Sequence, residues 1–248
     1  MPRISDDLYM GNANGPSLGF STDGNPAPME SGVGPMGRNF TYDIVPLTLQ
    51  VAGLTSSQNP GSGASFTLTA GTGVTAVVDA QGVTRYVLDV PRCVTLTAAG
   101  ANTATYRVTG YDAFGQPMTA NLAAPSTSTV ATTKAFKSII SITNINATAG
   151  TNGITAGFND KFGLPIVVND AGYIVKAGWA GVLAQDAGTF VAADATSPAT
   201  ALTTDVRGCY TPSSASNGAR RLVFTVAMPA TAVGPNSTRA GAFGQPQV

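Results

Sequence analysis

The chain is poor in the residues that usually build helices. Glu30 is the only glutamate among 248 residues, lysine occurs four times, and charged residues make up 10% of the sequence, against roughly 25% in ordinary soluble domains. Glutamate, lysine and leucine normally supply the surfaces and apolar stripes of helices. Threonine, valine, glycine, asparagine and proline are abundant instead, and they favour strands and turns. The composition therefore predicts a fold with little helix.

Short alternating segments, separated by turn residues, run through the middle of the chain. Residues 65–70 alternate apolar and polar side chains, and residues 74–90 form two apolar runs around the turn Asp79–Gly82. A second turn signal, Ser216–Gly218, introduces the alternating residues 220–228 and predicts another hairpin. Residues 136–150 fit a short helix or a strand, and their β-branched isoleucines favour a strand.

This spacing of short strands is typical of an all-β fold, with a sandwich or jelly-roll-like body of antiparallel strands. Parallel strands need crossover helices, and the sequence offers no convincing long helix. We expect the β body to span residues 41–230, either as one unit or as two β subdomains with a boundary near residue 150. An extended tail at 231–248 is rich in glycine and proline.

Residues 1–40 differ from the rest because they are dense in glycine, proline, asparagine and serine and show neither helical nor strand periodicity. Such a segment cannot bury enough apolar surface to fold alone. Its scattered large apolar side chains predict an extended N-terminal arm that becomes ordered against a partner, and the alternative is a disordered tail. The candidate partner-binding residues are Tyr9, Met10, Phe20, Met29, Met36 and Phe40.

Charge and hydropathy exclude several classes of partner. The formal net charge is zero and no basic patch is evident, so binding driven by nucleic-acid phosphates is not expected. The start, MPRISDDLYM, has no apolar core of the kind found in secretory signals, and no apolar run reaches about 18 residues. We therefore expect synthesis in a host cytoplasm, with no membrane partner.

The absence of histidine limits the chemistry of the chain. It removes the nucleophilic arrangements that depend on a histidine base and nearly every zinc site. The two cysteines, Cys93 and Cys209, each lie near an arginine in an expected strand, and we predict reduced, buried thiols. A disulfide between them remains an alternative that the sequence does not test. No cofactor is implied.

One compact pattern, Asp-x-Phe-Gly-x-Pro, occurs twice. The favoured interpretation is the same hairpin turn used twice, in which aspartate caps the loop, phenylalanine is at least partly buried, glycine adopts positive φ and proline ends the turn. Two alternatives are a calcium loop, for which one carboxylate per turn is too few, and an acid–base pair of the two aspartates. The residues concerned are Asp112, Phe114, Gly115 and Pro117 in the first copy and Asp160, Phe162, Gly163 and Pro165 in the second.

Val-Gly-Pro followed by an arginine and a phenylalanine also occurs twice, near the two ends of the chain. Residues 32–40 read GVGPMGRNF and residues 232–243 read AVGPNSTRAGAF. Two such similar extended segments are expected to lie near each other, or to pack equivalently on symmetry-related copies.

The sequence resembles virion structural proteins of tailed bacteriophages, in particular capsid decoration (cement) proteins. Three features carry the resemblance: RYVLDVPRCVTLTAAGANTATYRVTGYDAFGQPMTANL, then DVRGCYTPSSASNGARRLVFTVAMP, and the N-terminal arm rich in glycine, proline and methionine. It extends over most of residues 33–240. It implies a β-rich protein without an active site that is added to an assembled shell and bridges neighbouring subunits.

The expected function is therefore that of a non-enzymatic structural component at the capsid surface of a virion. The expected partners are the major capsid protein and copies of the chain itself, as a dimer or trimer. One alternative is a phage tail, fibre or receptor-binding protein. A carbohydrate-binding or carbohydrate-active β-sandwich is disfavoured by the scarcity of glutamate and by the single tryptophan.

Overall fold

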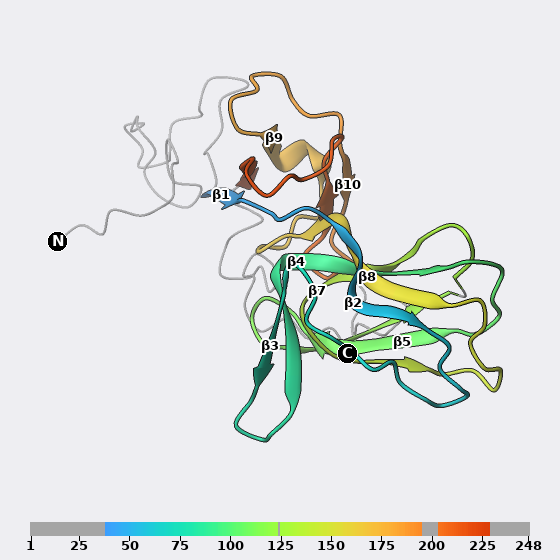
Figure 1. The fold of residues 1–248 in the computed structure, drawn as a ribbon. Coiled ribbons are helices and arrows are strands. Elements are labelled where there is room, and N and C mark those ends of the chain that lie inside the picture. Colours follow the sequence, from blue (N-terminus) through green and yellow to red (C-terminus); the bar gives the residue numbers. More distant parts are fainter. Residues whose placement is uncertain (1–37, 124, 195–202, 229–248) are drawn as a thin grey trace, which may run out of the picture.

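The computed structural model describes residues 38–123, 125–194 and 203–228, and these residues form an all-β fold (Figure 1). The prediction of antiparallel strands with little helix is confirmed, because every strand pair is antiparallel and the one helical element described is the 3-10 turn η1 at Ala171–Tyr173. The strands are β1 Arg38–Ile44, β2 Gln50–Gln58, β3 Val74–Val78, β4 Thr84–Ala98, β5 Tyr106–Tyr111, β6 Pro117–Leu122, β7 Val130–Asn144, β8 Ile154–Gly163, β9 Ile174–Trp179, β10 Thr189–Val191, β11 Cys209–Thr211 and β12 Leu222–Met228.

Nine strands form one strongly curled sheet, an open half-barrel. Its main path is β10-β11-β8-β4-β7-β5-β6, while β2 pairs with β8 and β3 pairs with β4. Register shifts interrupt the pairing of β4 with both β7 and β8, and such bulges bend and twist a sheet. Strands on both sides of residue 150 belong to this one sheet, so the strand arrangement shows no division of the body there.

The other three strands form a small sheet in the order β1-β12-β9, above the curled sheet in Figure 1. Its first two strands come from opposite ends of the described chain, and their register runs from Arg38 opposite Met228 to Ile44 opposite Leu222. The turn at Ser216–Gly218 forms, with Gly218 at φ 78°. The predicted hairpin across it does not form, because β11 lies in the curled sheet and β12 in the small sheet.

Two apolar cores follow from this arrangement. The first fills the concave side of the curled sheet and includes Phe136 and Phe158, which are fully buried. The second lies between the small sheet and the end of the curled sheet and includes Phe162 and Phe224. β8 therefore contributes one phenylalanine to each core, and the two cores meet along this strand.

Local turn chemistry agrees with the sequence in the hairpin of β3 and β4, which projects from the rest of the curled sheet (Figure 1). Asp79 accepts hydrogen bonds from the N–H groups of Gln81 and Val83, and Gly82 has φ 80°. Residues 136–144 belong to strand β7, as their isoleucines predict.

Gly157 allows β2 and β8 to approach closely, because a Cβ atom at this position would overlap the carbonyl oxygen of Gln50. We expect Gly157→Ala to lower the free energy of unfolding by about 1–3 kcal/mol, the usual cost of overpacking a tight interior. Urea unfolding followed by circular dichroism measures this. Gly61→Ala is the control because its Cβ would meet nothing within 4 Å. Equal unfolding midpoints for the two variants would contradict the assigned packing of β2 on β8.

Candidate functional site

The first Asp-x-Phe-Gly-x-Pro copy forms the predicted turn between β5 and β6. Asp112 Oδ1 accepts hydrogen bonds from the N–H groups of Phe114 (2.8 Å) and Gln116 (2.9 Å). Gly115 has φ 77°, and Pro117 is the exposed first residue of β6. Phe114 is half-buried, as expected. Every residue of this copy has the role that the sequence predicts.

The second copy does not form a hairpin turn, so the prediction of one device used twice is wrong. Asp160, Phe162 and Gly163 lie in strand β8 itself, and Pro165 follows in the connection toward η1. Gly163 is not among the glycines with positive φ. Close packing, not backbone conformation, requires a glycine at this position, because a Cβ there would lie 2.6 Å from the Cβ of Ala135. Phe162 is fully buried, as predicted.

The two copies share a different feature, which is a buried arginine bound by the aspartate and contacted by the phenylalanine. Asp112 pairs with Arg207, whose guanidinium lies 5.1 Å from the centre of the Phe114 ring. Asp160 pairs with Arg92, whose guanidinium lies 5.0 Å from the centre of the Phe162 ring. Both arginines are at most 2% exposed.

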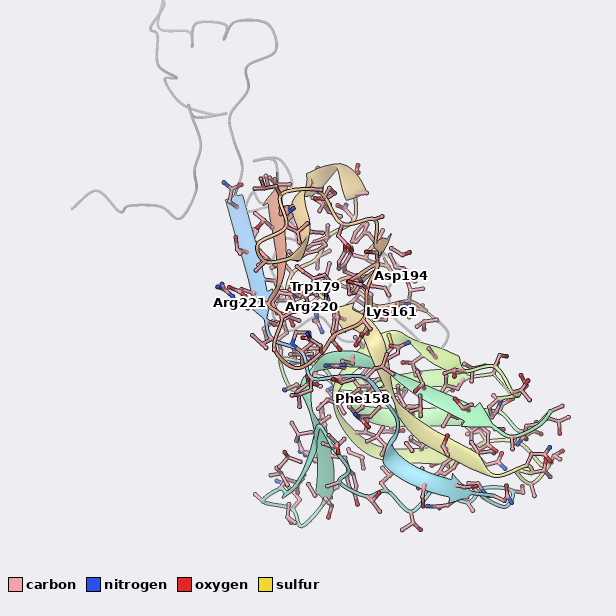
Figure 2. All side chains as sticks on the ribbon, turned by 45° about the horizontal axis from the view of Figure 1, so that its top comes forward. Phe158, Lys161, Trp179, Asp194, Arg220 and Arg221 are labelled. Atoms are coloured by element: carbon pink, nitrogen blue, oxygen red, sulfur yellow. The ribbon has the colours of Figure 1, made fainter. Side chains whose placement is uncertain are left out.

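The Arg92 cluster is the larger of the two and lies where the cores meet. Arg92 Nη1 donates to Asp160 Oδ1 (3.1 Å), and Nη2 donates to Asp89 Oδ2 (2.6 Å) and to the carbonyl oxygen of Leu47 (2.5 Å). Ser216 gives Asp160 two more donors, its N–H and its hydroxyl, each at 2.7 Å. The guanidinium also lies 5.0 Å from the ring centre of Phe158, which Figure 2 labels in the curled sheet.

The Arg207 cluster includes a second buried carboxylate. Asp205 accepts hydrogen bonds from the N–H groups of Ala135 (3.0 Å) and Arg207 (2.9 Å). Burial raises the pKa of Asp205 above its ordinary value. Lys134 is also fully buried, and the loss of hydration lowers its pKa to about 8, against the attraction of Asp205 and Asp194.

These contacts define what the aspartates can do chemically. A general base needs a free lone pair directed at a substrate, whereas Asp112 and Asp160 direct both oxygens at an arginine and at N–H or hydroxyl donors. A calcium loop would need six to eight oxygen ligands. Among the described residues, no group of three or more histidine, cysteine, aspartate or glutamate side chains is placed to hold a metal ion. The arrangement is that of a packed interior in which buried ion pairs connect separate parts of the chain.

The two cysteines are free and fully buried, as the sequence predicts. They belong to one small cluster with Ala135, against which Val191 packs. The neighbouring Cys93 thiol and burial together raise the pKa of Cys209 well above its usual value.

The predicted partner-binding residues fall in two groups. Phe40 lies in β1 and packs, half-buried, against the second core, so residues 38–40 of the expected arm belong to a strand of the body. Tyr9, Met10, Phe20, Met29 and Met36 lie outside the described residues. Because Arg38 pairs with Met228, β1 begins beside the point where β12 ends.

Sequence reasoning missed the buried partners Arg92, Arg207 and Ser216. One available signal was the placement of two arginines beside the cysteines in apolar segments of a chain with few charges. A charged residue in such a segment is rarely buried unless it is paired.

Comparison with known proteins gives no relative. No protein-family model, no curated protein and no solved structure matches the chain. Among the described residues, no helix has the length and apolar character needed to cross a bilayer.

Breaking the Arg92 cluster tests its structural role. We expect Arg92→Met to lower the free energy of unfolding by about 3–5 kcal/mol, because Asp160 and Asp89 are left without their buried counter-ion. Arg221→Met is the matched control. It breaks the ion pair between Arg221 and Asp43, whose side chains are 58% and 36% exposed. This substitution should change the free energy of unfolding little. Urea unfolding measures both variants, and similar midpoints would show that Arg92 is not a central brace.

Lys134 should make stability depend on pH. Its pKa is about 8 in the folded chain against 10.5 for the free side chain. Between these values the unfolded chain binds one more proton, so the free energy of unfolding should rise with pH. Relative to Lys134→Met, we expect the wild type to gain on the order of 2 kcal/mol from pH 8 to 10.5. Urea unfolding at several pH values measures the difference, and a difference that does not change with pH would contradict the prediction.

Proposed function

We propose that this chain is a structural virion protein that binds an assembled capsid shell and stabilises it by bridging neighbouring major capsid subunits. The resemblance to tailed-phage decoration proteins gives the class of function. The observation that carries the proposal is the pairing of Arg38 with Met228, which places the start of β1 beside the end of β12.

The chain on either side of this pairing would then act as two tethers attached at one place on the body. Residues 1–37 carry apolar side chains separated by glycine and proline, which suits an extended strap on a partner's surface. Ordering such a strap costs about 1–2 kcal/mol per residue, so only a large contact surface can offset it. A shell offers that surface repeatedly, and linked contacts add avidity.

The body supports this assignment through its stiffness. β1 and β12 pair over their full length, and the loop before β2 is tied to the Arg92 cluster through Leu47. A force applied at the start of β1 would therefore be transmitted through these contacts to the Arg92 cluster in the core. The buried aspartates are engaged by arginines and peptide donors, which supports a holding role over a catalytic one.

The sugar-binding alternative is weakened by the position of the only tryptophan. Trp179 is 5% exposed, its Nε1 donates to Ser214 (2.9 Å), and the Arg220 guanidinium covers its ring at 4.3 Å (Figure 2). Sugar sites commonly stack their ligands on an open aromatic face, and this ring has none to offer.

The test is the addition of the purified chain to phage heads assembled without it. We expect binding by co-sedimentation and a higher temperature of head disruption. A chain lacking residues 1–37 keeps all of β1 and should fold, but it should bind at least about tenfold more weakly, since the loss of one buried apolar side chain already costs about 1.5–3 kcal/mol.

A matched pair of arm variants separates anchoring from simple tethering. One variant replaces five apolar residues by serine, and the control replaces five polar residues of the same arm by alanine. Weaker binding of the first alone supports apolar anchors. Heads that neither bind nor gain heat resistance from the wild type would refute the proposal, and immunogold labelling of tails would favour the tail-protein alternative. The apolar set is Tyr9, Met10, Phe20, Met29 and Met36, and the polar set is Asn12, Asn14, Ser17, Ser21 and Asn25.

A further inference from the structure

We propose that Cys93 and Cys209 form a site for an intramolecular disulfide, which closes when the chain meets a disulfide oxidant and cross-links strands β4 and β11 of the curled sheet. The inference rests on the packing of the two thiols and is independent of the capsid proposal.

The strand arrangement brings these two residues together. Cys93 lies on β4 opposite Ala135 of β7, and Cys209 lies on β11 opposite Gly163 of β8. β8 separates β4 from β11 in the sheet, so their side chains would be far apart if the sheet were flat. The sheet is not flat here, because β4 has register shifts around Cys93 toward both of its neighbours.

A glycine shows how tightly the sheet curls at this point. A Cβ on Gly163 would lie 2.6 Å from the Cβ of Ala135, although β4 runs between their strands. Residues of next-but-one strands therefore come into contact at this point of the sheet. Cys93 and Cys209 are related across β8 in the same way, and they pack in one cluster with Ala135.

The two thiols share one buried cluster. Both are fully buried, and they pack with Ala135, against which Val191 lies. A disulfide needs two cysteines whose Cβ atoms lie about 3.5–4.5 Å apart, and the packing of both cysteines in one cluster with Ala135 brings them near each other.

A small disulfide such as oxidised glutathione serves as the oxidant. One cysteine, as thiolate, attacks the oxidant and releases one glutathione thiolate, which takes up a proton. The second cysteine then loses its proton, attacks the mixed disulfide and releases the second glutathione. Two protein thiols are oxidised to one disulfide, and one oxidant disulfide is reduced to two thiols.

Access to the oxidant depends on the short strand β11. It is held to β8 by the pairs Cys209–Gly163 and Tyr210–Phe162, and to β10 by three pairs. β11 is the second strand from this edge of the sheet, and β10 outside it is only three residues long. Short strands with few pairs open more readily than the core of a sheet. Opening exposes Cys209, and the reaction then speeds up with pH as the thiolate forms.

The consequence is a covalent cross-link, the Cys93–Cys209 disulfide, close to the ion pairs of the Arg92 cluster. Cys93 follows Arg92 directly in β4. Cys209 precedes Tyr210 in β11, and Tyr210 is part of the second core. A cross-link over residues 93–209 restricts the unfolded chain strongly because the loop it closes is long. A protein made under reducing conditions would thus become more stable after transfer to an oxidising medium.

The experiment treats the folded wild type with oxidised glutathione at pH 8 and then blocks free thiols after denaturation. We expect a mass lower by two hydrogens, a peptide linking Cys93 to Cys209, and a thermal midpoint raised by about 10 °C. Cys209→Ala cannot close the bond and should show no rise in midpoint on the same treatment.

Three outcomes would overturn the proposal: two free thiols per chain after prolonged oxidation, stable glutathione adducts in place of the internal bond, or a bond that joins two chains. A bond that forms without raising the midpoint would contradict its role as a brace. Because every readout uses the wild type first, a poorly folding cysteine variant does not obscure the result.

Discussion

The buried guanidinium of Arg92 is the interaction on which the rest of the structure depends. A charge without water costs several kcal/mol unless partners surround it, and here two carboxylates, a peptide carbonyl and two aromatic rings do so. Those partners come from three parts of the chain, namely the loop before β2, strand β4 and strand β8. The turn at Ser216 is a fourth part of the cluster, because it donates hydrogen bonds to Asp160.

This requirement explains how two sheets with separate cores hold one arrangement. β8 passes from the first core to the second, with Phe158 on one side of Arg92 and Phe162 on the other. Ser216 binds Asp160 and also the Leu47 carbonyl, so the turn that leads into β12 is fixed to the loop that follows β1. The paired strands β1 and β12 are thereby aligned on the curled sheet.

The sequence predicted those features that depend on neighbouring residues. The Asp79 and Asp112 turns form as expected, because an aspartate that caps its own loop needs only the next four residues. The all-β class followed from composition and alternation in the same way. The predicted hairpin between β11 and β12 is wrong, because a turn signal determines the turn but not the sheet that each flanking strand joins.

The second Asp-x-Phe-Gly-x-Pro copy shows where sequence reasoning ends. Its residues match those of the first copy, yet Asp160 lies inside a strand and finds its partner Arg92 in a strand 68 positions earlier. No local pattern encodes that pairing. What the two copies have in common becomes visible only in three dimensions, as an aspartate and a phenylalanine that enclose one arginine.

The use of charge in this chain connects its interior to its proposed role. Arginines and aspartates are scarce in the sequence, and several of them are buried as braces: Arg92, Arg207, Asp112, Asp160 and Asp205. The surface is therefore left short of charge, and a surface of that kind resists association poorly. A chain that works alone in solution gains nothing from this distribution. A chain that lies against other subunits does, since fewer charges must lose their water when the contact forms.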